Sequence, residues 1–516
     1  NNVIIGYNAG TGGGAALKEC VVIGVDAFNS TAANAQEGAV AIGREALTSL
    51  TSGSNNLAIG YNAGKTLTTG AQNLAIGREA LENHLTGECN IAIGYLAMGD
   101  TDAGTNSQDS DHNTFIGLVS GGGTWANTTS EYNVGVGNYT LDGAMDDANY
   151  NTAVGYAAGS AVTTADNGTF VGKYAGVAVT TGAANTGLGT NALGTATTST
   201  NNVAVGYRAL SEMRANGDGN VAIGKDAIMG NILDEDVNYM VGIGNACLLG
   251  NLESEASGTV AIGTSALASL VNGAGNIAIG YQAGDALTVG QYNTAVGYQA
   301  LSADDEGDSS TAIGYNALLR QNVGDGASNN TGVGKAAGLF NVTGTSNTYV
   351  GTGAGAGADG QSNSNNTAVG ANALLSITDG GENVAIGNAT GDALTTGHNN
   401  VFVGRAAGSA TVEVSDAVII GADAAEANMT TAANGTVAVG KQALAALTSG
   451  ERNLAIGYAS TKALTDGDDN VMIGYNAASA ANSSGFLRNV GVGNYVFDGF
   501  GSGVSAADNT AIGHLA

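Results

Sequence analysis

The sequence predicts an all-β protein, a parallel β-solenoid of about 29 short coils. The first observation is a motif, best seen at 55–64, that recurs along the whole chain with one index glycine, such as Gly60, in each of 29 copies. Fifteen of the 28 intervals are 17 residues long and the others are 18 to 23, a period typical of solenoids. The second is an invariable Ile, Val or Leu directly before that glycine. The third is the absence of Pro from all 516 residues, which keeps every backbone N–H available for ladders between coils.

The strand of each coil is predicted from the residues before the index glycine, counted here as position 0. Position −1 is Ile, Val or Leu, and position −3 is Val, Thr, Leu or Ile, in every copy. Two such residues, two positions apart, are typical of a short buried strand. We therefore expect positions −3 and −1 to form the core of the coil, in a ladder that includes Ile5, Ile59, Ile76, Val154, Ile279, Val296 and Ile456.

The intervening position −2 predicts an oligomer. It points to the opposite face of the strand, yet it is Ala in 16 copies, Gly in five and apolar or aromatic in eight. Strands that are apolar on both faces are covered on both faces. If the coil's own core covers one face, another chain covers the second. The expected inter-chain contacts are Ala58, Phe115, Phe170, Ala385, Phe402 and Ala455.

A second strand is predicted in the spacer between motifs. Leu followed by Thr, one further residue and Gly recurs there, with the glycine seven residues before the next index glycine. The leucines are Leu50, Leu67, Leu287, Leu394, Leu447 and Leu464. The glycines would supply positive φ or close passage of the backbone. The predicted coil is thus a flattened β-roll with two strands and two glycine corners. Residues 1–516 are expected to form one continuous solenoid domain, with both ends inside a repeat.

Two polar columns accompany the strand. Position −4 is Asn in 21 copies, and stacked amides can hydrogen-bond one coil to the next. This predicts an Asn ladder that includes Asn56, Asn73, Asn90, Asn293 and Asn453, with a polar binding stripe as the alternative. Position +1 is Tyr in ten copies and Lys or Arg in seven. It is either a half-exposed edge or, as we favour, a seam between chains through cation–π and ionic contacts, at Tyr61, Arg78, Lys173, Tyr281, Arg405 and Lys441.

Charge and residue usage exclude several classes of function. The formal net charge of −29 argues against nucleic acid and anionic membrane surfaces as partners. The lack of an apolar run of 18 residues argues against membrane insertion. The four His share no spacing that fits a metal site or a catalytic triad, so no enzyme and no cofactor is expected. Acidic loops at 304–308 and 466–469 could hold Ca²⁺, although solvated loops are the favoured interpretation.

The repeats at 151–158 and 293–300, both Asn-Thr-Ala-Val-Gly-Tyr-x-Ala, resemble the head repeats of YadA-like trimeric autotransporter adhesins. They equally resemble related repeats in phage and other viral tail fibres. The resemblance spans essentially the whole chain. It implies a left-handed parallel β-roll, three chains around a common axis, and display outside a cell or virion. The coils here are longer than the family's usual coil, which predicts extra corners.

The expected function is that of a structural fibre or adhesin shaft, formed by an extracellular homotrimer. The trimers could also join end to end in a longer fibre. The expected external partner is a host receptor or glycan. Three alternatives remain. An ice-binding solenoid needs a flat, regular Thr array, whereas Thr at position −3 is irregular here and is placed in the core by the pattern above. A glycan-binding solenoid would use the outer loops. A polysaccharide-cleaving tailspike needs paired carboxylates in a long groove, and no such constellation repeats.

Overall fold

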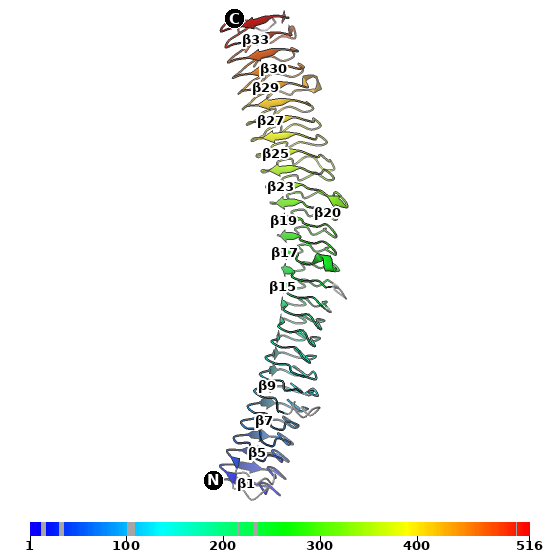
Figure 1. Cartoon of the computed structure of the whole chain (residues 1–516), viewed down its shortest axis with the longest axis vertical. Coiled ribbons are helices and arrows are strands. Elements are labelled where there is room, and N and C mark those ends of the chain that lie inside the picture. The colour runs from blue at the N-terminus through cyan, green and yellow to red at the C-terminus, as the bar shows by residue number, and fades with distance from the viewer. Residues whose placement is uncertain are drawn as a thin grey trace. The chain divides into compact units, whose positions relative to one another are not determined.

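A computed structural model describes residues 1–11, 17–29, 36–100, 109–126, 128–213, 216–230, 236–501 and 503–516. The chain comprises two compact units, Asn1–Thr259 and Val260–Ala516. Within each unit, coils stack on one another, and each coil contributes one three-residue strand that ends directly before an index glycine (Figure 1). Both units are therefore parallel β-solenoids, as the sequence predicts.

The first unit is built on strands that pair in parallel from coil to coil. They are β1 (Val3–Ile5), β3 (Val21–Ile23), β5 (Val40–Ile42), β6 (Leu57–Ile59), β7 (Leu74–Ile76), β8 (Ile91–Ile93), β9 (Thr114–Ile116), β10 (Val134–Val136), β11 (Thr152–Val154), β12 (Thr169–Val171), β13 (Thr186–Leu188), β14 (Val203–Val205), β15 (Val221–Ile223) and β16 (Val241–Ile243). Away from this sheet lie the two-residue pair β2 (Leu17–Lys18) and β4 (Gln36–Glu37), and the 3₁₀ turn η2 (Ser254–Ala256).

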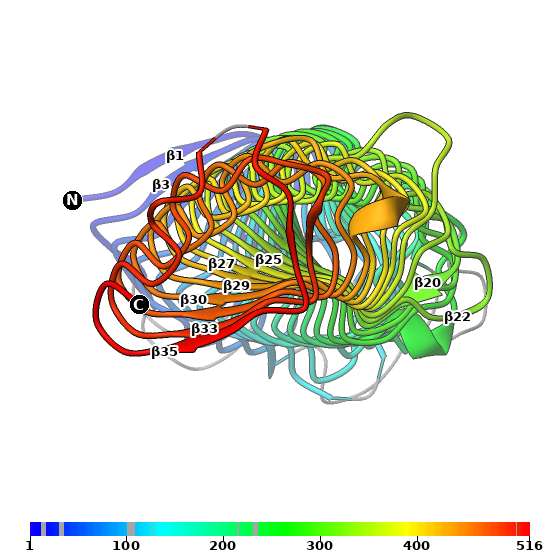
Figure 2. The same cartoon turned by 90° about the horizontal axis from the view of Figure 1, so that it is seen from above.

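The second unit repeats the same plan. Its sheet consists of β17 (Val260–Ile262), β18 (Ile277–Ile279), β19 (Thr294–Val296), β21 (Thr311–Ile313), β23 (Thr331–Val333), β24 (Thr348–Val350), β25 (Thr367–Val369), β26 (Val384–Ile386), β27 (Val401–Val403), β28 (Val418–Ile420), β29 (Val437–Val439), β30 (Leu454–Ile456), β31 (Val471–Ile473), β33 (Val490–Val492) and β35 (Thr510–Ile512). The short pairs are β20 (Gly307–Asp308) with β22 (Gly326–Ala327) and β32 (Phe486–Leu487) with β34 (Ala506–Ala507), and η3 is Thr431–Ala433. Viewed from above, β27, β29, β30 and β33 follow one side of the coil (Figure 2).

The strands pair in register, so equivalent positions of successive coils form columns. Leu57, Ala58 and Ile59 of β6 face Leu74, Ala75 and Ile76 of β7. The same residue-to-residue register holds between β26 and β27 and along the rest of each sheet. The columns identified in the sequence are therefore real columns in space.

The orientation of the strand is the reverse of the predicted one. Position −2 is inside the coil: Ala58, Phe115, Phe170, Ala385 and Phe402 are 0 % exposed and Ala455 is 1 % exposed within a single chain. These six residues cannot contact another chain, so their assignment as inter-chain contacts is wrong. Positions −3 and −1 point outward. Of the predicted core ladder, Ile59, Ile76, Val154, Val296 and Ile456 are half-buried, and Ile5 and Ile279 are exposed.

The physical reason is that other columns fill the coil. At position +4, side chains such as Leu47 and Leu81 are buried, and the spacer residues Leu50 and Leu67 are buried as well. Little room is left beneath the strand, and a small side chain fits there. A Cβ added to Gly332 at position −2 would lie 2.9 Å from the Leu318 side chain, which stands at +4 of the preceding coil.

Several large side chains at position −2 are balanced by glycine in an adjacent coil. Phe115 pairs with Gly135, Phe170 with Gly187. A Cβ at Gly135 would lie 2.6 Å from the Phe115 ring. Close packing of an interior requires this compensation of volume. The mixture of Gly and Phe in the column is therefore a property of the coil's own core.

At the six Leu-Thr repeats the predicted second strand does not form, and each leucine lies directly before a bend. Among the described residues, spacer strands occur as the two-residue pairs β2–β4, β20–β22 and β32–β34. Thr51 N and Ser52 N both donate to Thr68 O, at 2.7 and 3.1 Å. In a strand, consecutive N–H groups would point to opposite sides, so they would not share one carbonyl. The Thr hydroxyl adds a bond to the same carbonyl, since Thr51 Oγ1 donates to Thr68 O at 3.0 Å and Thr68 Oγ1 donates to Leu85 O at 3.0 Å. The Leu-Thr motif thus places Leu in the core and uses Thr to join coils.

The index glycine is required on two grounds. Gly60 has φ of +143°, outside the range that L-residues usually adopt, and a Cβ there would clash with the carbonyl oxygen of Gly77 in the next coil. The spacer glycine Gly53 has no such φ, but its Cβ would clash with the carbonyl of Gly70. Close passage of the backbone, the second of the two predicted reasons, explains the spacer glycines.

Replacing Gly60 by Ala is expected to lower the free energy of unfolding by more than about 2 kcal/mol, because backbone strain and a clash with a rigid carbonyl coincide there. Gly499→Ala is the matched control, since a Cβ at Gly499 would meet no atom within 4 Å. Denaturant unfolding of both variants tests this. Equal midpoints for the two would show that the stack relaxes around residue 60.

Candidate interaction surface

The outward side chains of each sheet form an apolar surface, here named the sheet face and defined as positions −3, −1 and +1 of the coils. At position −1, Leu188 is 46 %, Ile279 38 % and Ile386 42 % exposed. The remaining Ile, Val and Leu of the two strand positions are mostly half-buried, because neighbours in the same column shield them along the stack. The β-branched columns that predict the core thus lie on the outside of the coil.

Threonine is concentrated on part of the sheet face. In the second unit, five consecutive strands carry it at position −3, paired residue to residue. They are Thr294, Thr311, Thr331, Thr348 and Thr367, and all five are half-buried. The expectation that Thr at this position lies in the core is therefore wrong.

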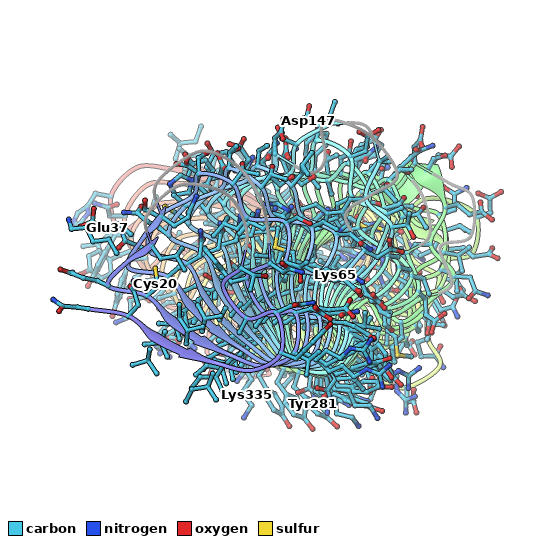
Figure 3. All side chains as sticks on the ribbon, turned by 90° about the horizontal axis from the view of Figure 1, so that it is seen from below. Cys20, Glu37, Lys65, Asp147, Tyr281 and Lys335 are labelled. Carbon is cyan, nitrogen blue, oxygen red and sulfur yellow. The ribbon has the colours of Figure 1, made fainter. Side chains whose placement is uncertain are left out.

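The +1 column runs along one border of the sheet face and makes contacts between coils of the same chain. Arg78 lies over the rings of Tyr61 and Tyr95, with its guanidinium carbon 5.8 and 5.5 Å from the ring centroids. Tyr281 stacks on Tyr298 with centroids 5.2 Å apart. Figure 3 shows Tyr281 and Lys335, both at position +1, pointing away from the ribbon on the same side. Cation–π contacts therefore occur here, and they are intrachain.

Four cations of the +1 column form ion pairs with acidic residues: Arg44, Arg78, Lys225 and Arg405. Hydrogen bonding to Glu79 at 2.9 Å raises the pKa of the Arg78 guanidinium. Arg405 donates to Asp423 Oδ2 of the next coil at 2.7 Å. Lys173 lies over the Tyr174 ring, 4.9 Å from its centroid, and Lys441 follows the index glycine of β29 with its side chain exposed. Ion pairs thus neutralise part of the column, which weakens the electrostatic field along this border.

The predicted Asn ladder is present as a buried chain of amides. Asn73 N and Nδ2 donate to Asn56 Oδ1 at 2.9 and 3.3 Å, and Asn90 N donates to Asn73 Oδ1 at 2.9 Å. Asn293 N donates to Oδ1 of Asn276, the preceding member of the ladder, at 2.9 Å. Asn453 Nδ2 donates to the carbonyl of Gly467 in the following spacer at 2.6 Å. Because these amides are almost fully buried, they serve the fold, and the alternative of a polar binding stripe is wrong.

The structure contains a second side-chain ladder, at position −6, that was not predicted from the sequence. Its side chains accept a hydrogen bond from the backbone N–H at −6 of the preceding coil. Asp218 accepts from Thr200 N at 2.6 Å, and Asp308 accepts from Gln291 N at 2.7 Å. Asp, Asn and Ser recur at this position, and that enrichment is the signal that could have revealed the ladder.

One acidic loop is divided between core and surface. Asp304 is buried in the column that Leu287 occupies one coil earlier, and Gln321 Nε2 donates to its Oδ2 at 2.6 Å. Burial raises the pKa of this carboxyl. Asp308 is engaged in the −6 ladder. The described residues contain no group of three or more His, Cys, Asp or Glu placed to hold a metal ion.

The described part of the chain contains no helix with the length and apolar character that crossing a membrane requires. Comparison of the chain with protein-family models, with curated proteins and with solved structures finds no match. The sheet face itself is therefore the starting point for a functional hypothesis.

Proposed function

We propose that the protein is the shaft of an extracellular fibre, on a cell surface or a virion, and that it assembles as a homotrimer through the sheet face. The observation that carries this proposal is the pair of outward β-branched columns at positions −3 and −1 of each unit. Contiguous apolar patches on monomeric proteins seldom exceed roughly 600 Å², and larger ones are typical of interaction sites. A column of half-exposed Ile, Val and Leu along every coil is such a surface.

A second copy of the chain is the partner that fits this surface. Because the columns repeat with each coil, the complementary surface must repeat with the same period along the same direction. An identical chain in parallel orientation satisfies that condition at every coil. The number three follows from the resemblance to YadA-like heads, in which three rolls surround a common axis.

The +1 column then lies at the border of the interface. Its Tyr rings and its ion-paired arginines, such as Arg78 and Arg405, suit a rim where apolar area meets water. The net charge of −29 would keep assembled fibres from associating side by side. In this arrangement the shaft needs no catalysis, and attachment is the role of its outer loops.

Negative-stain electron microscopy of the full chain tests the proposal. We expect particles whose cross-section contains three coils. Particles with the width of one coil, at concentrations where the chain is folded, would contradict it.

An ice-binding function is the second candidate, because the five consecutive Thr of the second unit are on the surface and regularly paired. Thermal hysteresis of the full chain measures this activity. Under the trimer proposal we expect none, since the same Thr residues are covered. Hysteresis that Thr331→Leu abolishes would favour ice binding instead.

A further inference from the structure

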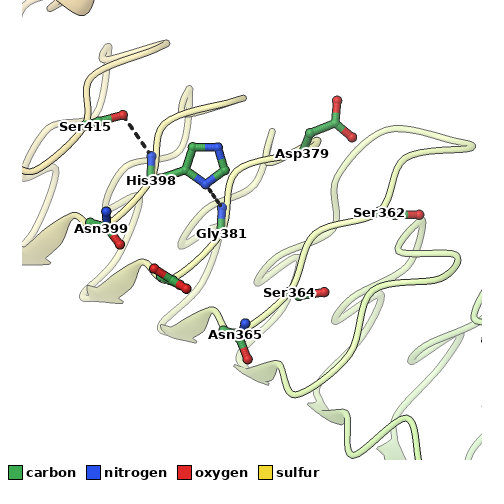
Figure 4. Close-up of a pocket in the computed structure, with 9 residues that line it drawn as sticks. Ser362, Ser364, Asn365, Asp379, Gly381, His398, Asn399 and Ser415 are labelled. Carbon is green, nitrogen blue, oxygen red and sulfur yellow. Dashed lines mark hydrogen bonds between the residues drawn. The ribbon is translucent and has the colours of Figure 1, made fainter. Parts of the chain in front are cut away.

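A polar depression of about 570 Å³ lies on the second unit, at the corner that leads into β25, β26 and β27 (Figure 4). Gly381 lies at its centre, and Asp379, Glu382 and His398 are among the residues that line it. We propose that this depression binds a neutral saccharide. The proposal names a ligand class for the attachment role above, and in that sense it rests on the proposed function.

The depression lies where Gly381 interrupts the −6 ladder. Ser364, Gly381, His398 and Ser415 are successive members of this column. His398 N donates to Ser415 Oγ at 3.1 Å, and Gly381 N donates to His398 Nδ1 at 2.9 Å. Gly381 has no side chain to continue the series, so the surface is hollowed at that coil.

The missing side chain leaves a backbone donor open. Thr345 N donates to Ser364 Oγ at 3.0 Å, as the ladder requires. The next bond would run from Ser364 N to residue 381, and glycine offers no acceptor. Within the part of the chain that the structure describes, the Ser364 N–H makes no hydrogen bond. An acceptor atom of a ligand can take this place.

His398 supplies a second donor of fixed orientation. Because Nδ1 accepts from Gly381 N, the proton of the neutral ring is on Nε2. The dashed lines in Figure 4 show the imidazole held from one side by Gly381, while Ser415 fixes the His398 backbone. The exposed Nε2–H is thus available to a ligand.

Carboxylates supply the acceptors. Glu382 is exposed and its side chain makes no hydrogen bond to the described residues. Asp379 is also exposed, and the Gln361 amide can donate to its two oxygens at 3.1 and 3.2 Å. Each carboxylate keeps lone pairs free for a ligand hydroxyl.

Donors and acceptors together select the ligand class. An anion would meet two carboxylates and no lining Lys or Arg, on a chain with a net charge of −29. A cation would leave the Ser364 and His398 donors unused. Sugar hydroxyls donate and accept at once, so a neutral saccharide matches both sets. Successive coils repeat at ~4.8 Å, close to the length of one pyranose ring, so rows of polar groups can follow a short oligosaccharide.

The test applies the labelled full chain to immobilised mannose-, glucose- and galactose-built oligosaccharides, with sialylated and uronate-containing ones beside them. We expect binding to at least one neutral class. Glu382→Gln removes the charge and replaces one acceptor oxygen by an NH2 donor. Gly381→Ser fills the depression with the residue present at 364 and 415. Both variants are expected to bind at least 10-fold more weakly.

Ala274→Ser is the control, because it makes a similar change in the same column outside the depression. It should bind as the unchanged chain does. Absence of binding to every neutral probe, preference for the anionic probes, or unchanged binding by Glu382→Gln and Gly381→Ser would each overturn the proposal. Since none of these residues is on the sheet face, the oligomeric state of each variant reports separately on the proposed shaft function.

Discussion

Replacing both Ile386 and Ile456 by Glu is expected to leave the solenoid folded and to weaken self-association at least 100-fold. Both side chains point outward at position −1, so a single chain can solvate the new charges. In an assembled fibre, the same charges would be buried against apolar neighbours without partners, which is strongly unfavourable. Circular dichroism measures the fold, and sedimentation velocity measures the association.

The matched control moves the same two charges by one residue, to Ala385 and Ala455. These positions are 0 and 1 % exposed inside the coil, so Ala385→Glu and Ala455→Glu should disrupt the stack itself. If Ala385→Glu folded while Ile386→Glu unfolded, the strand would have the orientation that the sequence pattern predicts, with position −1 inside the coil and position −2 outside. Unweakened association of the Ile386→Glu and Ile456→Glu double variant would remove the sheet face as the interface.

Replacing Asn383 by Ala is expected to lower the free energy of unfolding by about 3–5 kcal/mol. Asn383 Oδ1 accepts from Asn400 N at 3.0 Å and from Asn400 Nδ2 at 2.9 Å, while its Nδ2 donates to Gly397 O at 2.8 Å. Truncation leaves several buried polar groups unpaired, and each costs about 1–3 kcal/mol. Because the coils couple only to their neighbours, the loss concentrates at one point of the stack.

Asn388→Ala is the control for this experiment, since the exposed Asn388 side chain makes one long bond, from Nδ2 to Ala371 O at 3.3 Å. Chemical denaturation of both variants gives the comparison. A loss below about 1 kcal/mol for Asn383→Ala would mean that water or neighbouring coils replace the amide's bonds.

The fold could be predicted from the sequence because the motif of a solenoid repeats once in each coil. Strand bounds and the Asn ladder followed from columns alone: Leu57–Ile59 and Asn56 are where the pattern places them. The prediction of which face of the strand points into the coil was wrong. A three-residue strand has only one residue on its second face, so alternation cannot decide which face is inside, and hydropathy favoured Ile over Ala.

The local backbone explains why the smaller residue is inside. Leu47 at position +4 has φ of +52°, a left-handed conformation that is uncommon for a bulky residue, and it turns the side chain into the coil. No sequence rule predicts Leu in this conformation. The pairing of Phe115 with Gly135 in adjacent coils did carry the information, since volume compensation between neighbours indicates a shared interior.

The depression around Gly381 could not be predicted, because it depends on a ladder that was not recognised. Only when Ser364, His398 and Ser415 are known to occupy one column does a glycine between them become a gap. The glycine alone, in a chain with 84 of them, carries no signal.

The native mass of the full chain tests the central claim most directly. Mass photometry or sedimentation equilibrium at nanomolar to micromolar concentration should give about 151 kDa, the mass of three copies of the 50.4 kDa chain. A folded particle that remains at 50.4 kDa over this range would contradict the claim that the sheet face is covered by identical chains.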